Sequence, residues 1–356
     1  MDQISVTVVL PTFEESASLP SLIENMGNVR SQKLNLLKLI IVDDNSNDGT
    51  DSLIKKLNLD WVTLIVRKNE RGLSSAVIRG LEESSSKYCV VMDADGSHPA
   101  EAIPAMVGAI QDGADFAVGS RYIKGGTTED GWGVLRWLNS KIATIMARPF
   151  TKVIDPMSGF LAFRKSTFDN ATDLNPIGYK IGLELIVKCG CTKVTEVPIH
   201  FSTRQLGQSK LTIGVQFEYL QHVIRLLRFT HPKLVSFFTF ATVGLTGAVV
   251  YLAALNLITP LFDTRWHGIA LCVWIAMTWN FLWDRKYAFW YSRKNIFAQY
   301  LGFVAVCSVG VLANFYITNT LAESNAITYS GLIGVILGSC IGIAFNFIFT
   351  RIFVFK

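Results

Sequence analysis

Short apolar runs and helical repeats alternate along the first part of the chain. Four runs rich in apolar and β-branched residues predict buried strands, at residues 4–10, 37–42, 61–66 and 88–92. Apolar positions spaced by three and four residues predict helices between them, at about residues 19–26, 51–57 and 72–83. Because strand and helix alternate, we expect an α/β domain with a mostly parallel, doubly wound sheet over residues 1–211.

The last third of the chain has long apolar stretches in place of short ones. Four of them predict transmembrane helices, at roughly residues 234–258, 268–283, 297–321 and 329–349. The composition agrees, since 50% of the 356 residues are hydrophobic, 17% are charged, and the mean hydropathy is +0.34. We therefore expect residues 234–356 to form an all-α domain of four helices in the lipid bilayer.

A linking segment, residues 212–233, has a pattern of its own. Its apolar residues recur every three to four positions, at Ile213, Phe217, Leu220, Ile224 and Leu227. This spacing predicts an amphipathic helix, which could lie at the membrane surface or pack on the sheet. Its place directly before the membrane segment favours the surface.

The membrane segment contains an internal repeat. The pattern Asn-Phe-x-x-x-Arg-x-x-x-Phe that begins at Asn280 recurs 66 residues later, from Asn346. A phenylalanine followed seven positions later by glycine occurs at Phe237 and, at the same offset, at Phe303. Two related hairpins of two helices each would share one orientation in the membrane.

Lysine and arginine are unequally divided between the two sides of this predicted domain. One side carries Arg285, Lys286, Arg293, Lys294, Arg351 and Lys356, and the other shows only Arg265. Because the positive side faces the cytoplasm, we expect an integral protein of the cell membrane with the α/β domain and both termini cytoplasmic. The N-terminus leads straight into a strand, so no signal peptide is expected.

The fourth predicted strand ends in two carboxylates, Asp93 and Asp95. Side chains at i and i+2 of an extended segment point to the same side. Both could therefore face one spot at the carboxyl edge of the sheet, where open α/β sheets bind ligands. Their oxygens suit Mg²⁺ or Mn²⁺ shared with a diphosphate. The alternative is an acidic turn after a core strand.

Other patterns narrow the range of functions. The glycines match neither the dinucleotide-binding nor the P-loop motif. The net charge of +5 comes without a dense stripe of Lys and Arg, which argues against binding of nucleic acid. The six cysteines are scattered, and we expect them to be reduced or buried. Asp43 and Asp44 follow the second strand, where such folds hold a nucleotide, and helix N-capping is the alternative for Asp44.

Eight short motifs follow in order: PTFEE (11–15), VDDNS (42–46), GLSSA (72–76), DAD (93–95), GSRY (119–122), DPMSGF (155–160), NPIGYK (175–180) and R-x-x-G-x-S-K-L (204–211). Together they resemble glycosyltransferase family 2, and more narrowly the polyprenol-phosphate (dolichol-phosphate) mannose synthases. The membrane segment resembles the GtrA-type domain that accompanies some of these enzymes. The resemblance implies a GT-A (Rossmann-like) fold, a divalent cation, a nucleotide-diphosphate sugar donor, with GDP-mannose favoured, and a polyprenyl or dolichyl monophosphate acceptor.

The resemblance also implies roles for individual residues. The nucleoside would contact Pro11, Phe13, Glu15, Val42 and Asp44. The diphosphate and the metal ion would meet Asp93, Ala94 and Asp95, and the donor phosphates would also meet Arg121, Lys180, Arg204 and Lys210. The acceptor phosphate would bind Arg121, Arg136 and Ser140. Catalysis would depend on Asp93, Asp95, Arg121 and Arg136.

Three positions depart from patterns of the wider family. Glu14 stands where these synthases usually have Asn. Ser97, the expected third metal ligand, replaces a longer Gln, so either a water molecule fills the gap or the ligand comes from elsewhere. Gly133 breaks the Gln-x-x-Arg-Trp signature of processive polysaccharide synthases.

The chemistry can also be argued from the residues themselves. A departing diphosphate needs a metal ion and Lys or Arg to stabilise its charge. A phosphomonoester is largely dianionic at neutral pH, so it is already a nucleophile and needs no general base. Planar arginines such as Arg121 and Arg136 would position it; the alternative for Arg136 is a surface arginine that packs its stem.

Alternatives to this function remain open from the sequence. The same chemistry could use UDP-glucose, or the chain could be a flippase of lipid-linked sugars or a structural membrane adaptor. The intact pair of Asp93 and Asp95 favours an enzyme, because neither of the last two functions needs it. The membrane domain could serve as an anchor, a flippase or the interface of a homodimer.

The predicted orientation can be tested with single cysteines in a background without native cysteine. A cysteine at Ser324 should react with an impermeant thiol reagent outside sealed cells, whereas one at Ser292 should not. The reverse pattern of labelling would overturn the orientation.

Overall fold

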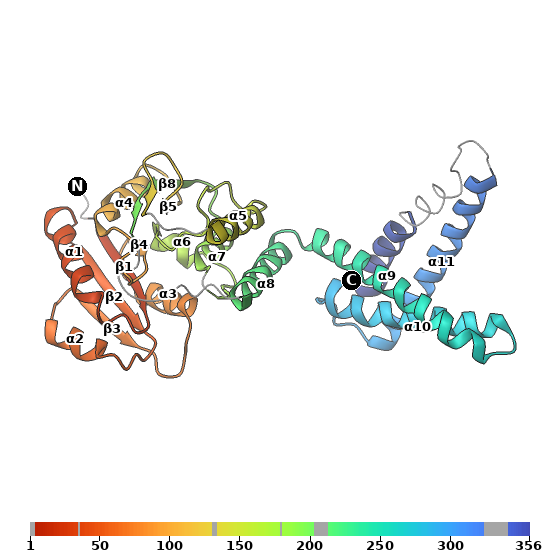
Figure 1. Cartoon of the computed structure of the whole chain (residues 1–356). Coiled ribbons are helices and arrows are strands. Elements are labelled where there is room, and N and C mark those ends of the chain that lie inside the picture. The colour runs from red at the N-terminus through yellow and green to blue at the C-terminus, as the bar shows by residue number, and fades with distance from the viewer. Residues whose placement is uncertain (1–3, 35, 130–133, 179, 203–212, 324–340) are drawn as a thin grey trace. The chain divides into compact units, whose positions relative to one another are not determined.

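The computed structural model describes residues 4–34, 36–129, 134–178, 180–202, 213–323 and 341–356 (Figure 1). The contacts divide the chain into two compact units, Met1–Leu226 and Leu227–Lys356. The boundary between the units falls inside the segment 212–233, which the sequence suggested as a link.

The first unit is built on a seven-stranded sheet with the order β3-β2-β1-β4-β7-β5-β8 (Figure 1). Neighbouring strands are parallel except at β7, which runs antiparallel to both β4 and β5. The strands are β1 (Ser5–Thr12), β2 (Leu36–Asp43), β3 (Val62–Val66), β4 (Tyr88–Val91), β5 (Phe116–Ser120), β7 (Leu161–Arg164) and β8 (Val194–Pro198). A separate parallel pair joins β6 (Thr127–Thr128) to β9 (His200–Phe201). The four predicted strands are β1 to β4, with ends within two residues of the prediction.

Helices cover both faces of this sheet. Alternate residues of β1 enter different cores: Val8 packs with Met26 and Ile103 of α1 and α4, and Val9 packs with Val77 of α3. The helices are α1 (Leu19–Gln32), α2 (Thr50–Leu57), α3 (Leu73–Glu82), α4 (Ile103–Gln111), α5 (Val134–Ala147), α6 (Lys165–Asp169) and α7 (Ile181–Lys188), with a 3-10 turn η1 (Ala100–Ala102) before α4. The prediction of a mostly parallel, doubly wound α/β fold is confirmed.

Helix α8 (Ile213–Thr230) has two different faces. Tyr219 and His222 are buried, and the Tyr219 hydroxyl donates to the carbonyl of Ala143 in α5 at 2.9 Å. Phe217 and Ile224, from the predicted apolar stripe, leave 63% and 39% of their surface exposed. One face of the helix therefore packs on the first unit, and another presents apolar side chains. That this second face lies at the membrane surface stays a prediction.

The second unit is helical. It contains α9 (Pro232–Ile258), η2 (Thr259–Leu261), α10 (Arg265–Trp283), η3 (Asp284–Ala288), α11 (Ile296–Glu323) and a last helix, Ile341–Phe355, which ends in the π-helical turn η4 (Thr350–Phe355). Among the described residues one helix, Pro232–Leu261, is long and apolar enough to cross a membrane, and Ile296–Gly310 and Ile341–Phe355 are shorter apolar helices. Much of the fourth predicted span lies outside the described residues. That all four helices cross the bilayer therefore stays a prediction.

The two hairpins of this unit make matching contacts. Phe289 stacks on Phe355, its partner in the repeat, with ring centroids 4.4 Å apart and 13° between the planes. Phe281 lies 6.2 Å from Phe355, and its own partner Phe347 lies 6.0 Å from Phe289. Such reciprocal pairs show that the repeat in the sequence is structural and that a pseudo-twofold axis relates the hairpins.

The first helices of the hairpins correspond at a different offset from the predicted one. Phe240 lies 5.6 Å from Phe347 and 6.1 Å from Phe289, and Phe303 lies 5.6 Å from Phe281 and 6.4 Å from Phe355. Phe237 also lies 5.2 Å from Phe347, but Phe240 is the residue that makes both contacts. Phe303 therefore corresponds to Phe240, 63 residues earlier, and the predicted partner Phe237 was wrong. A shift of three residues is close to one helical turn, so it keeps nearly the same face of the helix. The apolar pattern alone therefore does not separate the two registers.

In each hairpin a glycine of one helix packs against an asparagine of the other. A Cβ atom on Gly247 would lie 2.0 Å from Asn280 Oδ1, and one on Gly310 would lie 2.0 Å from Asn346 Oδ1. Within the described part of the chain, both Oδ1 atoms are buried without a hydrogen-bond partner. Glycine lets the two helices approach closely and leaves its Cα–H groups as the neighbours of these oxygens.

We expect Gly247→Ala to destabilise the helical unit by about 1–3 kcal/mol, because the added methyl group displaces Asn280. Gly244→Ala, one turn earlier on α9, is the matched control, since a Cβ there meets nothing within 4 Å. Thermal unfolding in detergent measures both variants. Equal losses in the two variants, or no loss in Gly247→Ala, would contradict this packing.

Candidate active site

The two carboxylates after β4 lie at the carboxyl edge of the sheet. Asp95 is 7% exposed, and its Oδ1 accepts hydrogen bonds from the backbone N–H (3.0 Å) and the hydroxyl (2.5 Å) of Ser97. The Asp93 side chain is 33% exposed and lies against Gly159, where a Cβ atom would come within 3.2 Å of both carboxylate oxygens. Hydrogen bonds from Ser97 thus fix the orientation of Asp95, whereas Asp93 is accessible to a ligand.

Ser97, the expected third metal ligand, is buried beside Asp95. It is 1% exposed, and its hydroxyl orients Asp95. Among the described residues, no group of three or more His, Cys, Asp or Glu side chains is arranged to hold a metal ion. Asp93 and Asp95 still offer the hard oxygens that Mg²⁺ and Mn²⁺ prefer. The pair fits a cation whose other ligands come from a bound diphosphate.

A buried histidine stabilises the turn between these carboxylates and the next helix. His98 Nδ1 accepts the backbone N–H of Asp93 at 3.1 Å. Its ring lies 5.3 Å from the ring of Phe160 and 5.4 Å from that of Phe201. Burial lowers the pKa of His98, which agrees with the neutral ring that this hydrogen bond requires.

Arg121, at the end of β5, forms a buried ion pair with Asp155. Its Nε and Nη2 donate to the two carboxylate oxygens at 2.7 Å each, and its backbone N–H donates at 3.1 Å. The two side chains are 10% and 1% exposed. Glu196 of β8 accepts the backbone N–H groups of Ile154 and Asp155 at 2.8 and 3.0 Å. Such a bidentate, supported pair fixes the orientation of the guanidinium group.

Lys180, the N-cap residue of α7, joins this group of charges. Burial lowers the pKa of its ammonium group, the nearby Arg121 lowers it further, and Asp93 and Asp155 raise it. The charges of Asp93, Arg121 and Lys180, three residues that the sequence assigned to the donor phosphates, therefore interact with one another.

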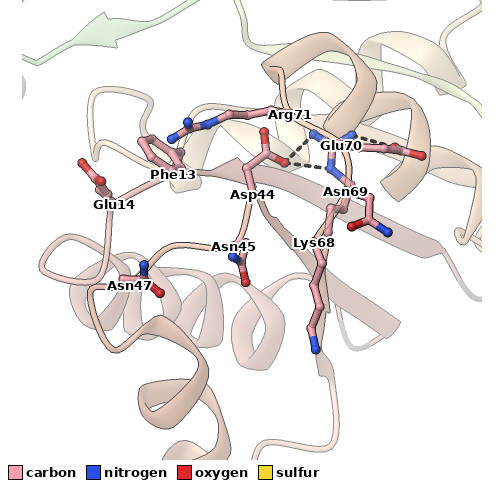
Figure 2. A pocket seen from close by; sticks show the side chains of 10 residues that line it. Phe13, Glu14, Asp44, Asn45, Asn47, Lys68, Asn69, Glu70 and Arg71 are labelled. Carbon is pink, nitrogen blue, oxygen red and sulfur yellow. Dashed lines mark hydrogen bonds and ion pairs between the residues drawn. The ribbon is translucent and has the colours of Figure 1, made fainter.

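A pocket of about 470 Å³ opens at the carboxyl ends of β1, β2 and β3 (Figure 2). Its lining residues are Phe13, Glu14, Asp44, Asn45, Asn47, Arg67, Lys68, Asn69, Glu70 and Arg71. Figure 2 shows the guanidinium group of Arg71 over the ring of Phe13, with its central carbon 4.0 Å from the ring centroid. A guanidinium group stacked on an aromatic ring, beside several amides and carboxylates, suits a flat polar ring such as a nucleobase.

One wall of the pocket depends on a second buried ion pair. Asp44 Oδ1 accepts hydrogen bonds from Arg67 Nε at 2.7 Å and from Arg67 Nη2, and Asp44 Oδ2 accepts the backbone N–H of Gly72 at 2.7 Å. Arg67 also donates to Ser75 Oγ and the Gly72 carbonyl, both at 2.9 Å. The side chains of the pair are 5–6% exposed. Asp44 thus fixes the 67–72 loop and does not cap a helix.

Asp43, the other candidate for contact with the nucleotide, holds the backbone of this loop. It is 2% exposed and accepts hydrogen bonds from the hydroxyl of Thr12 (3.0 Å) and from the backbone N–H (2.8 Å) and hydroxyl (2.6 Å) of Ser46. Of the two candidates, Asp44 is the one that lines the pocket.

The other residues expected around the nucleoside lie near this pocket or under it. Pro11 and Val42 are register partners in β1 and β2, and both are buried. The Glu15 carbonyl accepts the backbone N–H of Ser18 at 3.1 Å, in the turn before α1. The Ser18 hydroxyl donates to the carbonyl of Ala94 at 2.7 Å, so it ties this turn to the two carboxylates after β4.

The residues expected around the acceptor are only partly described. Ser140 lies on α5, and its hydroxyl is 3.3 Å from that of Tyr122. Arg136 is also on α5, and its side chain is outside the described part of the structure. Arg204 and Lys210 lie outside the described residues.

Four residues of the site were missed by reasoning from the sequence: Arg67, Arg71, His98 and Asp155. Each lies within or beside a segment that the sequence did single out. A basic residue directly after the third predicted strand, at the ligand-binding edge, was the available signal for Arg67. Asp155 opens one of the recognised motifs, but nothing local shows that its partner is Arg121.

Replacing Arg67 tests whether the Asp44 pair maintains the pocket. We expect Arg67→Met to lower the stability of the first unit by about 3–5 kcal/mol, because it leaves Asp44 buried and unpaired. Lys68→Met, in the same pocket but at an exposed side chain, is the control and should have little effect. Chemical denaturation measures both, and similar stability of the two variants would contradict this role.

Comparison with known proteins agrees with these features. Residues 7–171 match the model of glycosyl transferase family 2, and residues 239–355 match the GtrA/DPMS transmembrane domain. A dolichol-phosphate mannosyltransferase of Pyrococcus furiosus is 37% identical over 320 residues, which cover 88% of this chain and 90% of that protein.

Two further relatives match a shorter part of the chain. A dolichol-phosphate mannosyltransferase of Saccharomyces cerevisiae is 37% identical over 67% of this chain and 93% of its own length. A polyprenol monophosphomannose synthase of Mycolicibacterium smegmatis is 33% identical over 58% of this chain and 80% of its own length. The chain is thus a family 2 glycosyltransferase with a GtrA/DPMS membrane domain, and it belongs to the family of the dolichol-phosphate mannosyltransferases.

Proposed function

We propose that this protein transfers mannose from GDP-mannose to a polyprenyl or dolichyl monophosphate, with inversion at the anomeric carbon. The names of its relatives support mannosyl transfer to a lipid phosphate. The observation that carries the proposal is the group of Asp93, Arg121, Asp155 and Lys180, on the same edge of the sheet as a pocket suited to a nucleobase. Two cations beside an accessible carboxylate suit a sugar nucleotide and a phosphate.

Asp93 and Asp95 would hold Mg²⁺ or Mn²⁺ together with the donor diphosphate. When bound, such an ion would neutralise the charge that develops on the departing diphosphate. Lys180, Arg204 and Lys210 would bind the same phosphates as fixed positive charges. Ser97 would act indirectly, because its hydroxyl holds the Asp95 carboxylate in its orientation.

The polar contacts of the site favour a phosphate acceptor over a hydroxyl acceptor. A hydroxyl needs a general base, but Asp155 is paired with Arg121, and His98 is buried with its Nδ1 engaged. The accessible Asp93 would be occupied by the metal ion. A phosphomonoester is already anionic. It requires positioning, which a guanidinium held by Asp155 supplies without loss of side-chain freedom on binding. Arg136 and Ser140 on α5 would complete the acceptor site.

An exposed apolar face of the first unit suits contact with a lipid surface. On α5, Leu138, Ile142 and Ile145 are exposed, and on α8 Phe217 and Leu220 are exposed. The hydrogen bond between Tyr219 and Ala143 makes the two helices neighbours. We expect this face to lie at the cytoplasmic membrane surface, with the second unit crossing the bilayer as four helices.

The donor and acceptor are tested together with purified protein in detergent and MgCl₂ or MnCl₂. We expect a mannolipid from GDP-mannose and polyprenyl phosphate, and loss of product when EDTA removes the metal ion. A glucolipid from UDP-glucose in its place would show that the sugar and base are wrong. No glycolipid from either donor would remove the enzymatic proposal and favour a flippase or an adaptor.

Two arginine variants distinguish the donor site from the acceptor site. Arg136→Ala should retain donor affinity and lose transfer, and Arg136→Lys should not rescue it, because a point charge cannot replace a two-pronged contact. Arg204→Ala should weaken donor binding itself. Calorimetry with GDP-mannose and metal ion, beside transfer rates over a range of polyprenyl phosphate, measures both. Equal losses of donor affinity would place both arginines on the donor.

A further inference from the structure

A buried polar cluster lies between α7 and α8, apart from the carboxylates of the site. Glu184 and His222 are fully buried, and Lys188 is 5% exposed. Glu184 Oε1 is 2.8 Å from Lys188 Nζ, and Glu184 Oε2 is 3.6 Å from His222 Nε2. Burying ionisable groups costs free energy unless they are paired and hydrogen-bonded. The proposed reaction does not use these side chains directly, so their role lies in what their hydrogen bonds hold in place.

The cluster holds the loop that precedes α7. His222 Nδ1 accepts the backbone N–H of Ile177 at 3.4 Å, and Glu184 Oε1 accepts that of Asn175 at 2.9 Å. Arg225, also on α8, donates from Nη1 to the carbonyl of Asn175 at 2.6 Å. Two side chains of α8 and one of α7 thus fix the backbone of this loop.

The far end of the loop reaches the active site. Gly178 has a φ of +66°, a left-handed conformation that favours glycine, and its carbonyl accepts a hydrogen bond from Ser74 Oγ at 2.6 Å. Lys180 follows two residues later as the N-cap residue of α7, and its charge interacts with those of Asp93 and Arg121. Because so few residues separate Gly178 from Lys180, a displacement of the loop also displaces the lysine.

We propose that His222 is a positioning residue for Lys180, so that α8 takes part in binding the anionic diphosphate of the donor. The ligand concerned is a nucleotide-diphosphate sugar, and the inference rests on the proposed function for the place of Lys180 at that diphosphate. The helix that leads to the membrane unit would thereby support the donor site, in addition to its contact with α5.

The contact with Ile177 requires a neutral imidazole. Since Nδ1 accepts an N–H, the proton of the ring is on Nε2, which faces Glu184. Burial lowers the pKa of His222, Glu184 raises it, and Arg225 and Lys188 lower it. Because the folded-state pKa is below the ordinary value of 6.5, the contact is fully present above pH 6.5. It is lost as the pH falls through the folded-state pKa.

Two substitutions separate the two ends of the imidazole. His222→Asn keeps an acceptor near the position of Nδ1, whereas His222→Gln keeps a polar group near that of Nε2. We expect His222→Gln to raise the Kd for GDP-mannose about fivefold, the effect of one lost hydrogen bond. It should also increase labelling of Lys180 by an amine reagent, read by mass spectrometry. His222→Asn should resemble the unaltered protein in both measurements and should weaken the acid loss of donor affinity below pH 6.5.

The variant Lys180→Met tests the route of this effect. If His222 acts through Lys180, adding His222→Gln to Lys180→Met leaves donor affinity unchanged. Equal effects of His222→Asn and His222→Gln, unaltered labelling of Lys180, or an additive loss in the double variant would overturn the proposal. If His222→Gln does not fold, Arg225→Met, which loosens the loop at Asn175, replaces it with the same expected results.

The labelling of Lys180 requires no donor. A protein that uses another sugar nucleotide would therefore still show the expected labelling, and only the proposed donor would fail. Unchanged labelling together with mannosyl transfer would remove the role of His222 and leave the proposed function intact.

Discussion

The active site depends on the buried ion pair between Arg121 and Asp155. Removing two charges from water costs several kcal/mol per ion unless the geometry is good and further hydrogen bonds satisfy both partners. Here three N–H groups of Arg121 reach Asp155, and Glu196 holds the backbone behind it. The pair joins the end of β5, the loop before β7, and β8. The charges of the pair also interact with that of Lys180. The pair therefore fixes the backbone around the site and contributes to its electrostatic potential.

The buried ion pair between Asp44 and Arg67 likewise fixes the backbone at the other end of the site. It fixes a loop of the pocket at the ends of β1 to β3, whereas the Arg121 pair fixes the region proposed for the donor phosphates. Between these rigid ends, Asp93 keeps a third of its side chain exposed. Fixed charges around an accessible carboxylate are the arrangement that electrostatic stabilisation of a departing diphosphate needs, since nothing has to reorganise during the reaction.

The sequence predicted β1 to β4 and their helices because buried parallel strands produce continuous apolar runs. It also predicted Asp44, Asp93 and Arg121, which stand at strand ends. Their partners were missed because Arg67 is 23 residues from Asp44, and Asp155 is 34 residues from Arg121. No local pattern encodes such a pairing. The packed face of α8 was among the alternatives, but its residues were not identified for a similar reason, since a buried His222 resembles a polar surface position until α7 is placed beside it.

The pseudo-twofold symmetry of the helical unit bears on which side chains its interior can contain. Asp284 and Thr350 occupy matching positions in the two hairpins, and both are buried. If the hairpins were identical separate chains, a buried carboxylate at this position would occur twice, and the cost of burying an ionisable group would be incurred twice. Because one polypeptide carries both hairpins, each copy can change independently, and a single carboxylate has a hydroxyl as its counterpart. Two hairpins within one chain thus permit an asymmetric interior that a symmetric pair of chains cannot have.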